Sequence, residues 1–379
     1  MKLQISSKEL QRALSVVSKI IRSKNSMPVL DNAMLHEKDG KYLLTASDVE
    51  NELAIAVDLM LMEGKFTPVC INPKVILPAL SSLPEQPLNI EISEDGHYTT
   101  KVEYLGGSFN IVSLPANEFP MISGVNANEA LVSFDINTNV LIPCIRGANM
   151  STAADELRPI MGCVCMDVKP DGVIFVGSDG HKLYKYAHTP GAPFGNGTGP
   201  VLVHTSVVSA IENAFKGDVD VHVVCNGKFA EFSSADVRFV SRQLDTRYPN
   251  YESVIPTKPA YHAIVNTKSL LNTIKRVGLF ASDSSRMIRL QYDGTALVLS
   301  AEDIDFSTSS KETLDVIDTN LPADFSIGFK DNTLIQHLSV ISTDNVRLCL
   351  DDPSRPVLIK NDDVNSPLTL LMMPMLLNT

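Results

Sequence analysis

Alternating apolar and polar residues predict short β-strands joined by tight turns at three similar places along the chain. Each place carries an Asp-Gly pair between two alternating segments, at Asp39-Gly40, Asp171-Gly172 and Asp293-Gly294. Asp-Gly in that setting is the strongest short-range signal for a β-hairpin. A second signature follows each hairpin, at Ala46-Ser47-Asp48, Gly177-Ser178-Asp179 and Ala301-Glu302-Asp303. We infer that one structural unit is used three times.

Apolar residues at helical spacing predict two helices in each copy of this unit. Leu10, Leu14 and Val17 show the spacing in the first of them. The first helix of each copy is expected at 7–24, 137–152 and 266–282, and the second at 72–83, 204–216 and 331–342. A further hairpin is expected after each second helix, at Asp95-Gly96, Asn226-Gly227 and Asp344-Asn345.

The order of these landmarks predicts an α+β fold of three repeated domains, each with two helices packed on antiparallel sheets. Hairpins join successive strands directly, and this connection makes neighbouring strands antiparallel. At 379 residues the chain is longer than a single hydrophobic core supports. Phe119-Pro120 and Tyr248-Pro249 close the first two copies, so we expect domains at 1–125, 126–256 and 257–379.

The net charge of −12 argues against a nucleic-acid partner, but the charges are unevenly distributed. Only Glu9, Glu212 and Asp331 are acidic on the predicted helical stretches. The predicted helices are therefore rich in basic residues. A general preference of charged side chains for exposed helix positions could explain this excess, but that preference would have enriched Glu as well. We therefore predict that the helices meet the phosphates of a nucleic-acid duplex. The basic residues concerned are Lys8, Arg12, Lys19, Arg22, Lys24, Lys74, Arg146, Lys216, Lys268, Lys275 and Arg276.

Neither a membrane span nor a secreted protein is indicated. No apolar run approaches the roughly 18 to 20 residues that cross a bilayer. Lys8, Glu9 and Arg12 interrupt the N-terminal apolar pattern, which argues against a signal peptide. The one close cysteine pair, Cys163 and Cys165, alternates on one strand face as core residues do. We expect a cytoplasmic protein with reduced thiols.

No catalytic, metal or cofactor site is predicted. The run Ser178-Asp179-Gly180-His181 has residue types found in catalytic sites, but a turn explains these adjacent residues equally well. Asp48, Asp179 and Asp303 occupy equivalent places in different copies, so each is expected to cap its own turn. The sequence has neither a P-loop nor a dinucleotide-binding fingerprint.

Short motifs along the whole chain carry a resemblance to a known family. They are Met27-Pro28-Val29-Leu30, Ser113-Leu114-Pro115-Ala116 with Phe119-Pro120, Ser178-Asp179-Gly180-His181-Lys182-Leu183, Arg247-Tyr248-Pro249-Asn250-Tyr251 and Met373-Pro374-Met375. In this order and spacing, the chain resembles the bacterial sliding clamps, the beta subunits of DNA polymerase III.

The resemblance implies the DNA-clamp fold and a head-to-tail homodimer whose six domains form a ring around duplex DNA. In such a ring the helices line the hole and the sheets form the rim. The protein would be a processivity factor with no catalytic residues and no cofactor. The resemblance also implies subunit contacts through Phe109, Leu279 and Phe280, and a DNA contact at Lys24.

The resemblance further implies a pocket for short linear peptides of the replicative polymerase, the clamp loader, and repair and other polymerases. Flexible methionine side chains near the C-terminus suit a pocket that accepts varied partners. Lys182 and Leu376 stand where arginines are common in the family. The matching positions are Ile160, Ser178, Gly180, His181, Lys182, Leu183, Pro249, Val254, Pro356, Leu371, Met372, Met373, Pro374, Met375 and Leu376.

The residues alone leave two other functions open. One is a three-domain metabolic enzyme with a site at a domain junction near His181 and Tyr248. The other is a monomeric peptide-binding scaffold with no role on DNA. The mass of the native particle distinguishes a dimeric clamp from a monomeric scaffold.

Overall fold

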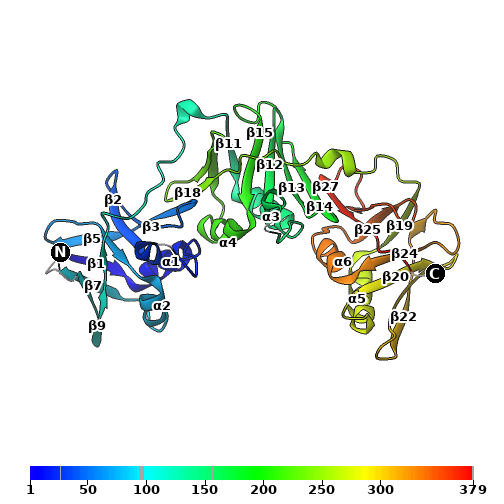
Figure 1. Cartoon of the computed structure of the whole chain (residues 1–379), viewed down its shortest axis with the longest axis horizontal. Coiled ribbons are helices and arrows are strands. Elements are labelled where there is room, and N and C mark those ends of the chain that lie inside the picture. Colours follow the sequence, from blue (N-terminus) through cyan, green and yellow to red (C-terminus); the bar gives the residue numbers. More distant parts are fainter. Residues whose placement is uncertain (26, 94–97, 156, 378–379) are drawn as a thin grey trace. The chain divides into compact units, whose positions relative to one another are not determined.

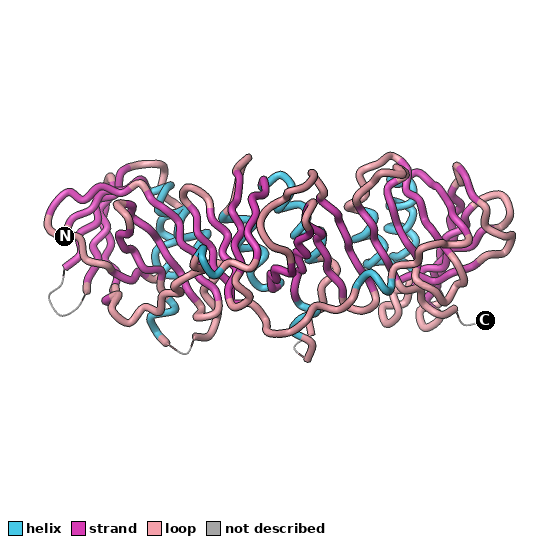
Figure 2. The backbone as a smooth tube through the Cα atoms, turned by 90° about the horizontal axis from the view of Figure 1, so that it is seen from above, coloured by secondary structure: helices cyan, strands magenta, loops and turns pink. Residues whose placement is uncertain are grey.

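The computed structural model describes residues 1–25, 27–93, 98–155 and 157–377, and the chain divides into two compact units (Figure 1). The first unit consists of Met1–Pro143 with Ala192–Asp245, and the second of Cys144–Gly191 with Thr246–Thr379. In each unit the helices lie together beside the strands (Figure 2). The three domain boundaries expected from the sequence stay a prediction, because this division follows them only in part.

The elements of the first third of the chain begin with a strand and a helix. They are β1 (Lys2–Ser6), α1 (Ser7–Val17), the 3-10 helix η1 (Pro28–Asp31), β2 (Ala33–Lys38), β3 (Lys41–Ser47), β4 (Asn51–Val57), β5 (Leu59–Glu63), β6 (Val69–Ile71), α2 (Pro73–Ser81), β7 (Pro87–Ser93), β8 (Thr99–Tyr104), β9 (Gly107–Val112) and β10 (Leu114–Pro115).

The other two thirds follow the same succession. The middle third contains η2 (Ala127–Glu129), β11 (Val132–Asn137), α3 (Thr138–Asn149), η3 (Pro159–Gly162), β12 (Cys163–Lys169), β13 (Gly172–Ser178), β14 (Lys182–His188), β15 (Gly199–His204), α4 (Thr205–Ala214), β16 (Asp220–Cys225), β17 (Phe229–Ser233), β18 (Val237–Arg242) and η4 (Tyr251–Val254). The last third contains β19 (Tyr261–Asn266), α5 (Thr267–Val277), η5 (Gly278–Phe280), β20 (Met287–Tyr292), β21 (Leu297–Asp303), β22 (Thr308–Leu314), β23 (Asp318–Thr319), β24 (Ser326–Lys330), α6 (Asp331–Leu338), β25 (Asn345–Leu350), β26 (Val357–Asn361) and β27 (Leu368–Met372).

The predicted helices form, but several end earlier than predicted. The helix α1 ends at Val17 instead of Lys24, since the β-branched residues and serines at 15–18 are weaker helix formers than Leu or Ala. The start of α2 agrees with its sequence signal. The side-chain oxygen of Asn72 accepts the backbone N–H of Lys74 at 3.0 Å, and Pro73 takes the first helical position.

The predicted hairpins are confirmed wherever the structure describes them, with one exception. Asp39 and Gly40 adopt positive φ angles of 52° and 77° and connect β2 to β3. Asp171-Gly172, Asp293-Gly294 and Asn226-Gly227 lie at the β12–β13, β20–β21 and β16–β17 turns. Asp95-Gly96 lies outside the described residues.

The hairpin predicted at Asp344-Asn345 is wrong. This pair lies between α6 and β25, and the turn that joins β25 to β26 spans 351–356. The carbonyl oxygens of Thr343 and Asp344 instead accept the hydroxyl and the N–H of Thr267, at 2.9 and 2.8 Å. The segment is therefore held against the first turn of α5.

Antiparallel sheets form the strand layers of both units. In the first unit they run β5-β1-β7-β8-β9 and β10-β6-β2-β3-β4-β18-β17-β16-β11. In the second unit they run β12-β13-β14-β27-β26-β25-β19-β23 and β22-β21-β20-β24. The strands β9 and β22 are the last members of their sheets.

Two of these sheets pass through the boundaries between repeats, and they do so in the same register. Glu52 of β4 lies opposite Val240 of β18, and Leu183 of β14 lies opposite Leu371 of β27. Leu183 follows Glu52 in the sequence by the same number of positions as Leu371 follows Val240. The two boundaries are therefore equivalent joints.

One core cluster of the first unit unites motifs that lie far apart in sequence. Val29, Leu30 and Phe119 are buried there with Met34 and Cys70, and Met27, Leu114 and Ala116 pack against them. The motifs at 27–30, 113–116 and 119–120 thus share one packing role. This explains why they occur together in the chain.

Candidate functional site

All eleven basic residues predicted to meet DNA are exposed, although not all lie on helices. Lys8 and Arg12 lie on α1, Lys74 on α2, Arg146 on α3, and Lys268, Lys275 and Arg276 on α5. The helix assignment is wrong for Lys19, Arg22 and Lys24, which follow α1, and for Lys216, which follows α4. The basic residues predicted to contact DNA therefore lie both on helices and on the segments that follow α1 and α4.

Intramolecular carboxylates neutralise part of this charge. Arg12 pairs with Glu9 at 2.8 Å, Arg22 with Asp48 at 2.7 Å, Arg276 with Glu312 at 2.6 Å, and Lys74 with Asp31 at 4.0 Å. The hydrogen bonds that the Arg276 guanidinium donates to Glu312 raise the pKa of Arg276, with a smaller coulombic contribution in the same direction. Within the described part of the chain, no ion pair involves Lys19, Lys24, Lys216, Lys268 or Lys275. These lysines are the strongest candidates for phosphate contacts.

The first half of the candidate peptide site is a rigid turn between β13 and β14. The carboxylate of Asp179 accepts the N–H groups of His181 and Lys182, both at 2.8 Å. The hydroxyl of Ser178 donates to the carbonyl oxygen of Lys182 at 2.9 Å, and Gly180 has a φ of 92°. A left-handed residue at this point favours glycine. The run Ser178–His181 is thus a turn, as the sequence indicated.

Asp48 and Asp303 have the same role in the other repeats, as predicted. Asp48 accepts the N–H of Asn51 at 2.7 Å, and Asp303 accepts the N–H of Phe306 at 3.2 Å. Among the described residues, no group of His, Cys, Asp and Glu side chains is placed to hold a metal ion. The three aspartates stabilise backbone turns.

The second half of the peptide site joins the turn through strand pairing. Lys182 and Leu183 lie opposite Met372 and Leu371, and the N–H of Met373 donates to the carbonyl oxygen of His181 at 2.7 Å. The structure therefore brings the 178–183 and 371–376 motifs side by side within the second unit.

The predicted pocket residues differ in exposure. Leu183, Leu371 and Met372 are buried, so their main role is to support the joint. Exposed residues are Gly180, His181, Pro249, Val254, Met373 and Leu376. Half-buried ones are Ile160, Ser178, Lys182, Pro356, Pro374 and Met375. A ligand can therefore contact fewer residues than the predicted set contains.

Lys182 contacts other parts of its own chain. Its ammonium group donates to the carbonyl oxygen of Met150 at 2.5 Å and to Gln336 of α6 at 3.3 Å. Burial lowers the pKa of Lys182. Next to Gln336, His337 is almost fully buried, and burial lowers its pKa to about 4. Lys182 thus links the end of α3 to α6.

Asp167 and Lys185, which no sequence motif indicated, hold in place the η4 segment that carries Val254. The hydroxyl of Tyr251 donates to Asp167 of β12 at 2.7 Å, and Lys185 of β14 pairs with Glu252 at 2.6 Å. Both Tyr251 and Glu252 belong to η4. The Tyr248-Pro249 motif points to this segment, but its partners on β12 and β14 are distant in sequence.

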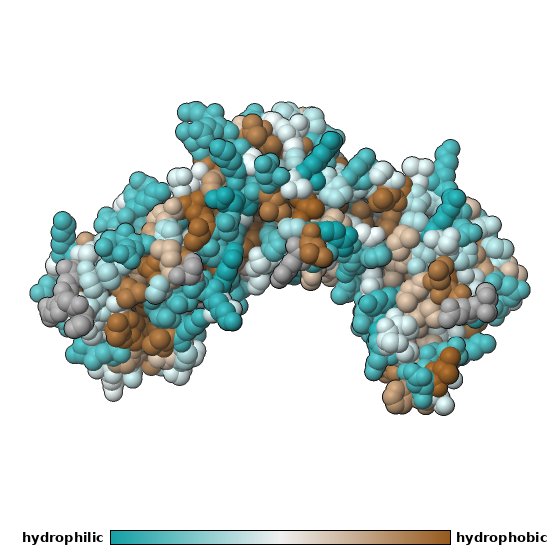
Figure 3. Space-filling model, in the orientation of Figure 1, coloured by the Kyte–Doolittle hydropathy of each residue, from teal (hydrophilic) through white to brown (hydrophobic). Residues whose placement is uncertain are grey.

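The residues predicted for a subunit contact lie at or beside sheet edges. Phe109 lies on β9, and Leu279 and Phe280 lie on η5 and are exposed. Ile304 and Phe306, in the turn before β22, are 82% and 78% exposed and were not predicted. Apolar side chains gather between α2 and β9 and beside β22 (Figure 3). Such exposed apolar groups mark interaction surfaces.

Two family models match this chain. The DNA polymerase III beta subunit N-terminal domain matches residues 1–123, and the C-terminal domain of the same subunit matches residues 252–376. The chain belongs to the DNA polymerase III beta subunit family. The resemblance that the sequence motifs indicated is therefore confirmed.

Curated relatives in this family match nearly the whole chain. A beta sliding clamp of Synechococcus elongatus is 27% identical and covers 100% of both chains. One from Rickettsia bellii is 25% identical and covers 95% of this chain and 96% of its own. One from Escherichia coli is 23% identical and covers 99% of this chain and 100% of its own.

Solved beta subunit structures share the fold over their full length. A crystal structure from Thermotoga maritima has a TM-score of 0.89 at 21% identity, and one from Bacillus subtilis has 0.90 at 20%. A Pseudomonas aeruginosa sliding clamp bound to griselimycin has 0.89 at 23%. Each covers 100% of both chains. The predicted α+β clamp fold is confirmed.

Proposed function

We propose that this protein is a ring-shaped, homodimeric sliding clamp that encircles duplex DNA without sequence preference. It tethers the replicative polymerase and other partners for processive DNA synthesis. Membership in the beta subunit family supports this function. Tethering by encirclement needs no catalytic residue and no cofactor, so the protein acts as a processivity factor. Its proposed location is the cytoplasm.

The pairing of strands at the repeat boundaries carries the proposal of a ring. The pairs β4–β18 and β14–β27 each join the last strand of one sheet to the last strand of a sheet from the next repeat. The strands β22 and β9 hold the corresponding places in the third and first repeats, and each ends its sheet. A β22 edge from one copy fits a β9 edge from a second copy. Two such seams close two chains into a ring.

Apolar side chains at both edges support this seam. Val112 on β9 is 76% exposed, and Leu279 beside β22 is 77% exposed. A monomer would leave these groups in water, whereas a closed ring buries them. Depletion of charge and burial of aromatic and aliphatic anchors are typical of stable interfaces.

The exposed lysines and arginines support loose contact with phosphates. Lys268 and Lys275 project from α5, whose Leu270 and Ile274 are buried. Contacts between such cations and phosphates carry no sequence information. A clamp with this surface remains on DNA through its topology and is free to slide.

The site beside β14 and β27 is proposed to bind short linear peptides from the replicative polymerase, the clamp loader and repair polymerases. Exposed apolar groups such as Val254 and Met373 support this assignment, as do the rigid 178–182 turn and the anchored η4. Because Lys182 already contacts Met150 and Gln336, the peptide meets less positive charge than arginine at this position would offer.

The alternatives are not favoured. A metabolic enzyme near His181 would need a catalytic group, but the surrounding turn engages its polar side chains in backbone hydrogen bonds. None of the helices described combines the length and hydrophobicity that a membrane crossing requires. A monomeric scaffold would leave the β9 and β22 edges unused.

Native mass spectrometry together with DNA retention tests the proposal. We expect a particle of twice the 41.3 kDa chain mass, which stays on closed circular DNA after loading and leaves when the circle is cut. A particle with the mass of a single chain, or equal retention on circular and linear DNA, would contradict the ring.

A further inference from the structure

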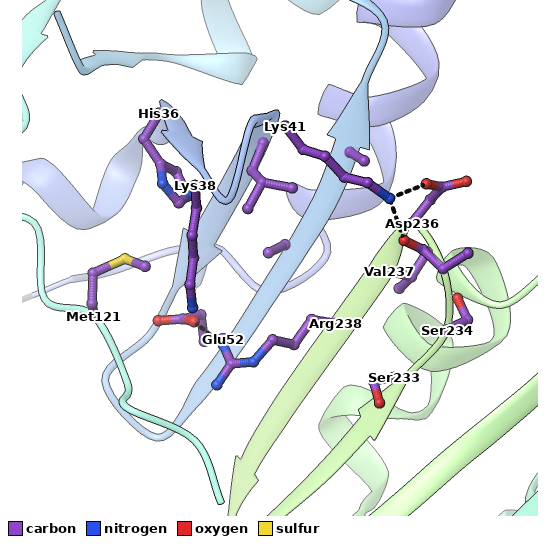
Figure 4. Close-up of a pocket in the computed structure, with 14 residues that line it drawn as sticks. His36, Lys38, Lys41, Glu52, Met121, Ser233, Ser234, Asp236, Val237 and Arg238 are labelled. Carbon is purple, nitrogen blue, oxygen red and sulfur yellow. Dashed lines mark hydrogen bonds and ion pairs between the residues drawn. The ribbon is translucent and has the colours of Figure 1, made fainter.

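The first unit contains a cavity of about 180 Å³ on one face of the β2–β3–β4 sheet, where β18 joins it (Figure 4). Leu43, Ala54 and Ala56 line it from β3 and β4, and Met121 lines it from the chain segment that leaves the first repeat. Lys38 and Arg238 also line the cavity, and their cationic ends lie near Glu52.

The second repeat has an equivalent face, which its own chain covers. Lys38 opposite Lys41 closes the β2–β3 hairpin, and Lys169 opposite Gly172 closes the β12–β13 hairpin. Counting from these hairpins, Asp167 is the counterpart of His36, and Lys185 is the counterpart of Ala54.

In the second repeat, the side chain of Tyr251 occupies this face. Its hydroxyl bonds to Asp167 at 2.7 Å, and the Lys185 ammonium lies 5.9 Å from the centre of its ring. Tyr251 is buried. The fold thus accommodates one aromatic ring at this position, next to a cation.

We propose that the cavity of the first repeat binds a single uncharged aromatic ring. Its size fits, because an engineered apolar cavity of about 150 Å³ binds benzene. Its lining also fits, since cations such as Lys38 interact favourably with aromatic faces, and the thioether of Met121 with aromatic rings.

The charges of the cavity favour a neutral ring over an anion. Lys41 pairs with Asp236, and Arg238 pairs with both Glu52 and Glu231. Burial lowers the pKa of His36, so this side chain is neutral at pH 7. Lys41 and Arg238 therefore already have counter-charges, and the positive charge of Lys38 acts on the carboxylate of Glu52, so the cavity does not require an anionic ligand.

The ring can belong to a small phenolic compound or to a tyrosine side chain of a partner protein. Methyl NMR of the full-length protein tests the site with three probes: phenol, N-acetyl-tyrosinamide and cyclohexanol. We expect phenol to shift the Met121 and Leu43 methyl signals in a saturable manner, while the buried Met166 methyl of the second unit stays constant. An equal response to N-acetyl-tyrosinamide identifies a side-chain ligand, and a response to phenol alone identifies a small molecule.

Two variants check that the shifts come from this cavity. Ala56→Leu fills it and should abolish the phenol response. Met121→Ala removes the thioether and should weaken phenol binding several-fold, as read from Leu43. No saturable shift with phenol, or equal shifts with cyclohexanol, would overturn the proposal. Because the cavity lies within the first unit, either result is independent of ring formation.

Discussion

Arg238 of β18 donates a hydrogen bond of 2.8 Å to the fully buried carboxylate of Glu52 on β4. The same carboxylate accepts the N–H of Ile122 at 2.6 Å. Arg238 also reaches Glu231, which accepts the N–H of Val125. One ion-pair network therefore fastens the β4–β18 joint and the connecting segment that crosses it.

Arg238→Met should destabilise the first unit by about 3 kcal/mol, because it leaves Glu52 buried without its counter-charge. Burial raises the pKa of Glu52 and Arg238 counteracts this shift, so the loss of Arg238 further disfavours the charged carboxylate. Urea unfolding measures the change. The double variant Glu52→Gln/Arg238→Met should recover much of it.

Arg242→Met on the same strand is the matched control, since its partner Glu50 is exposed. This variant should lower the free energy of unfolding by less than about 1 kcal/mol. Equal losses for the two arginine variants would show that burial of Glu52 is unimportant for the joint.

His337 should make stability fall as the pH decreases below neutrality. In the folded protein its pKa is lowered to about 4, whereas an unfolded histidine titrates at its ordinary 6.5. The unfolded chain therefore binds a proton first, and stability is lost as the pH falls from 6.5 toward 4. The loss is at most on the order of 3 kcal/mol. Denaturant unfolding between pH 8 and pH 4.5 measures it.

The variant His337→Leu removes this titration and should have a flatter pH profile. Its absolute stability is not the test, because the contact between the imidazole and Ser151 is also lost. Identical slopes for the variant and the parent would exclude His337 as the cause.

Leu279→Lys should break the proposed seam by placing a charge among apolar groups. The native mass should fall from a dimer to the single 41.3 kDa chain, with circular dichroism unchanged. Val364→Lys, at a fully exposed position elsewhere in the same unit, should remain dimeric. A dimeric Leu279→Lys would place the interface at another surface.

The double variant Lys24→Glu/Arg146→Glu should weaken DNA association in a salt-dependent way. The slope of log affinity against log salt should decrease by about one per lost phosphate contact. Lys258→Glu makes the same type of charge change outside the predicted helices and should have a smaller effect. Unchanged DNA affinity in the double variant would remove both residues from the DNA surface.

Deletion of Met373 to Thr379 should abolish binding of polymerase peptides and leave the dimer intact. The deletion removes the exposed Met373 and the hydrogen bond of 2.8 Å from Met375 to Gly328, but it leaves β9, η5 and β22 unchanged. Fluorescence anisotropy with a labelled peptide measures the loss. Removal of only the last two residues is the control, and unchanged affinity in the longer deletion would refute the site.

The features that the sequence predicted well depend on local chemistry. Asp39-Gly40 forms a tight hairpin because both residues tolerate positive φ, and Asn72 caps α2 through its own side chain. Asp48 and Asp179 accept N–H groups only two or three residues away. Family, fold class and sliding-clamp function are confirmed by the comparisons.

The features that it missed depend on contacts distant in sequence. Asp344-Asn345 does not form a hairpin because Thr267 of α5 binds this segment. The direction of the Lys182 side chain is set by Met150 and Gln336, which no local pattern relates to it. Burial of Leu371 likewise follows from its pairing with β14. The three domain boundaries and the roles of the peptide-site and DNA-facing residues stay predictions.

Images of single particles test the central claim most directly. If two chains close through their β9 and β22 edges, averaged particles will show a twofold-symmetric annulus with a hole wide enough for duplex DNA. Compact particles without a hole, or open arcs of one chain at concentrations where the native mass is that of a dimer, would contradict encirclement.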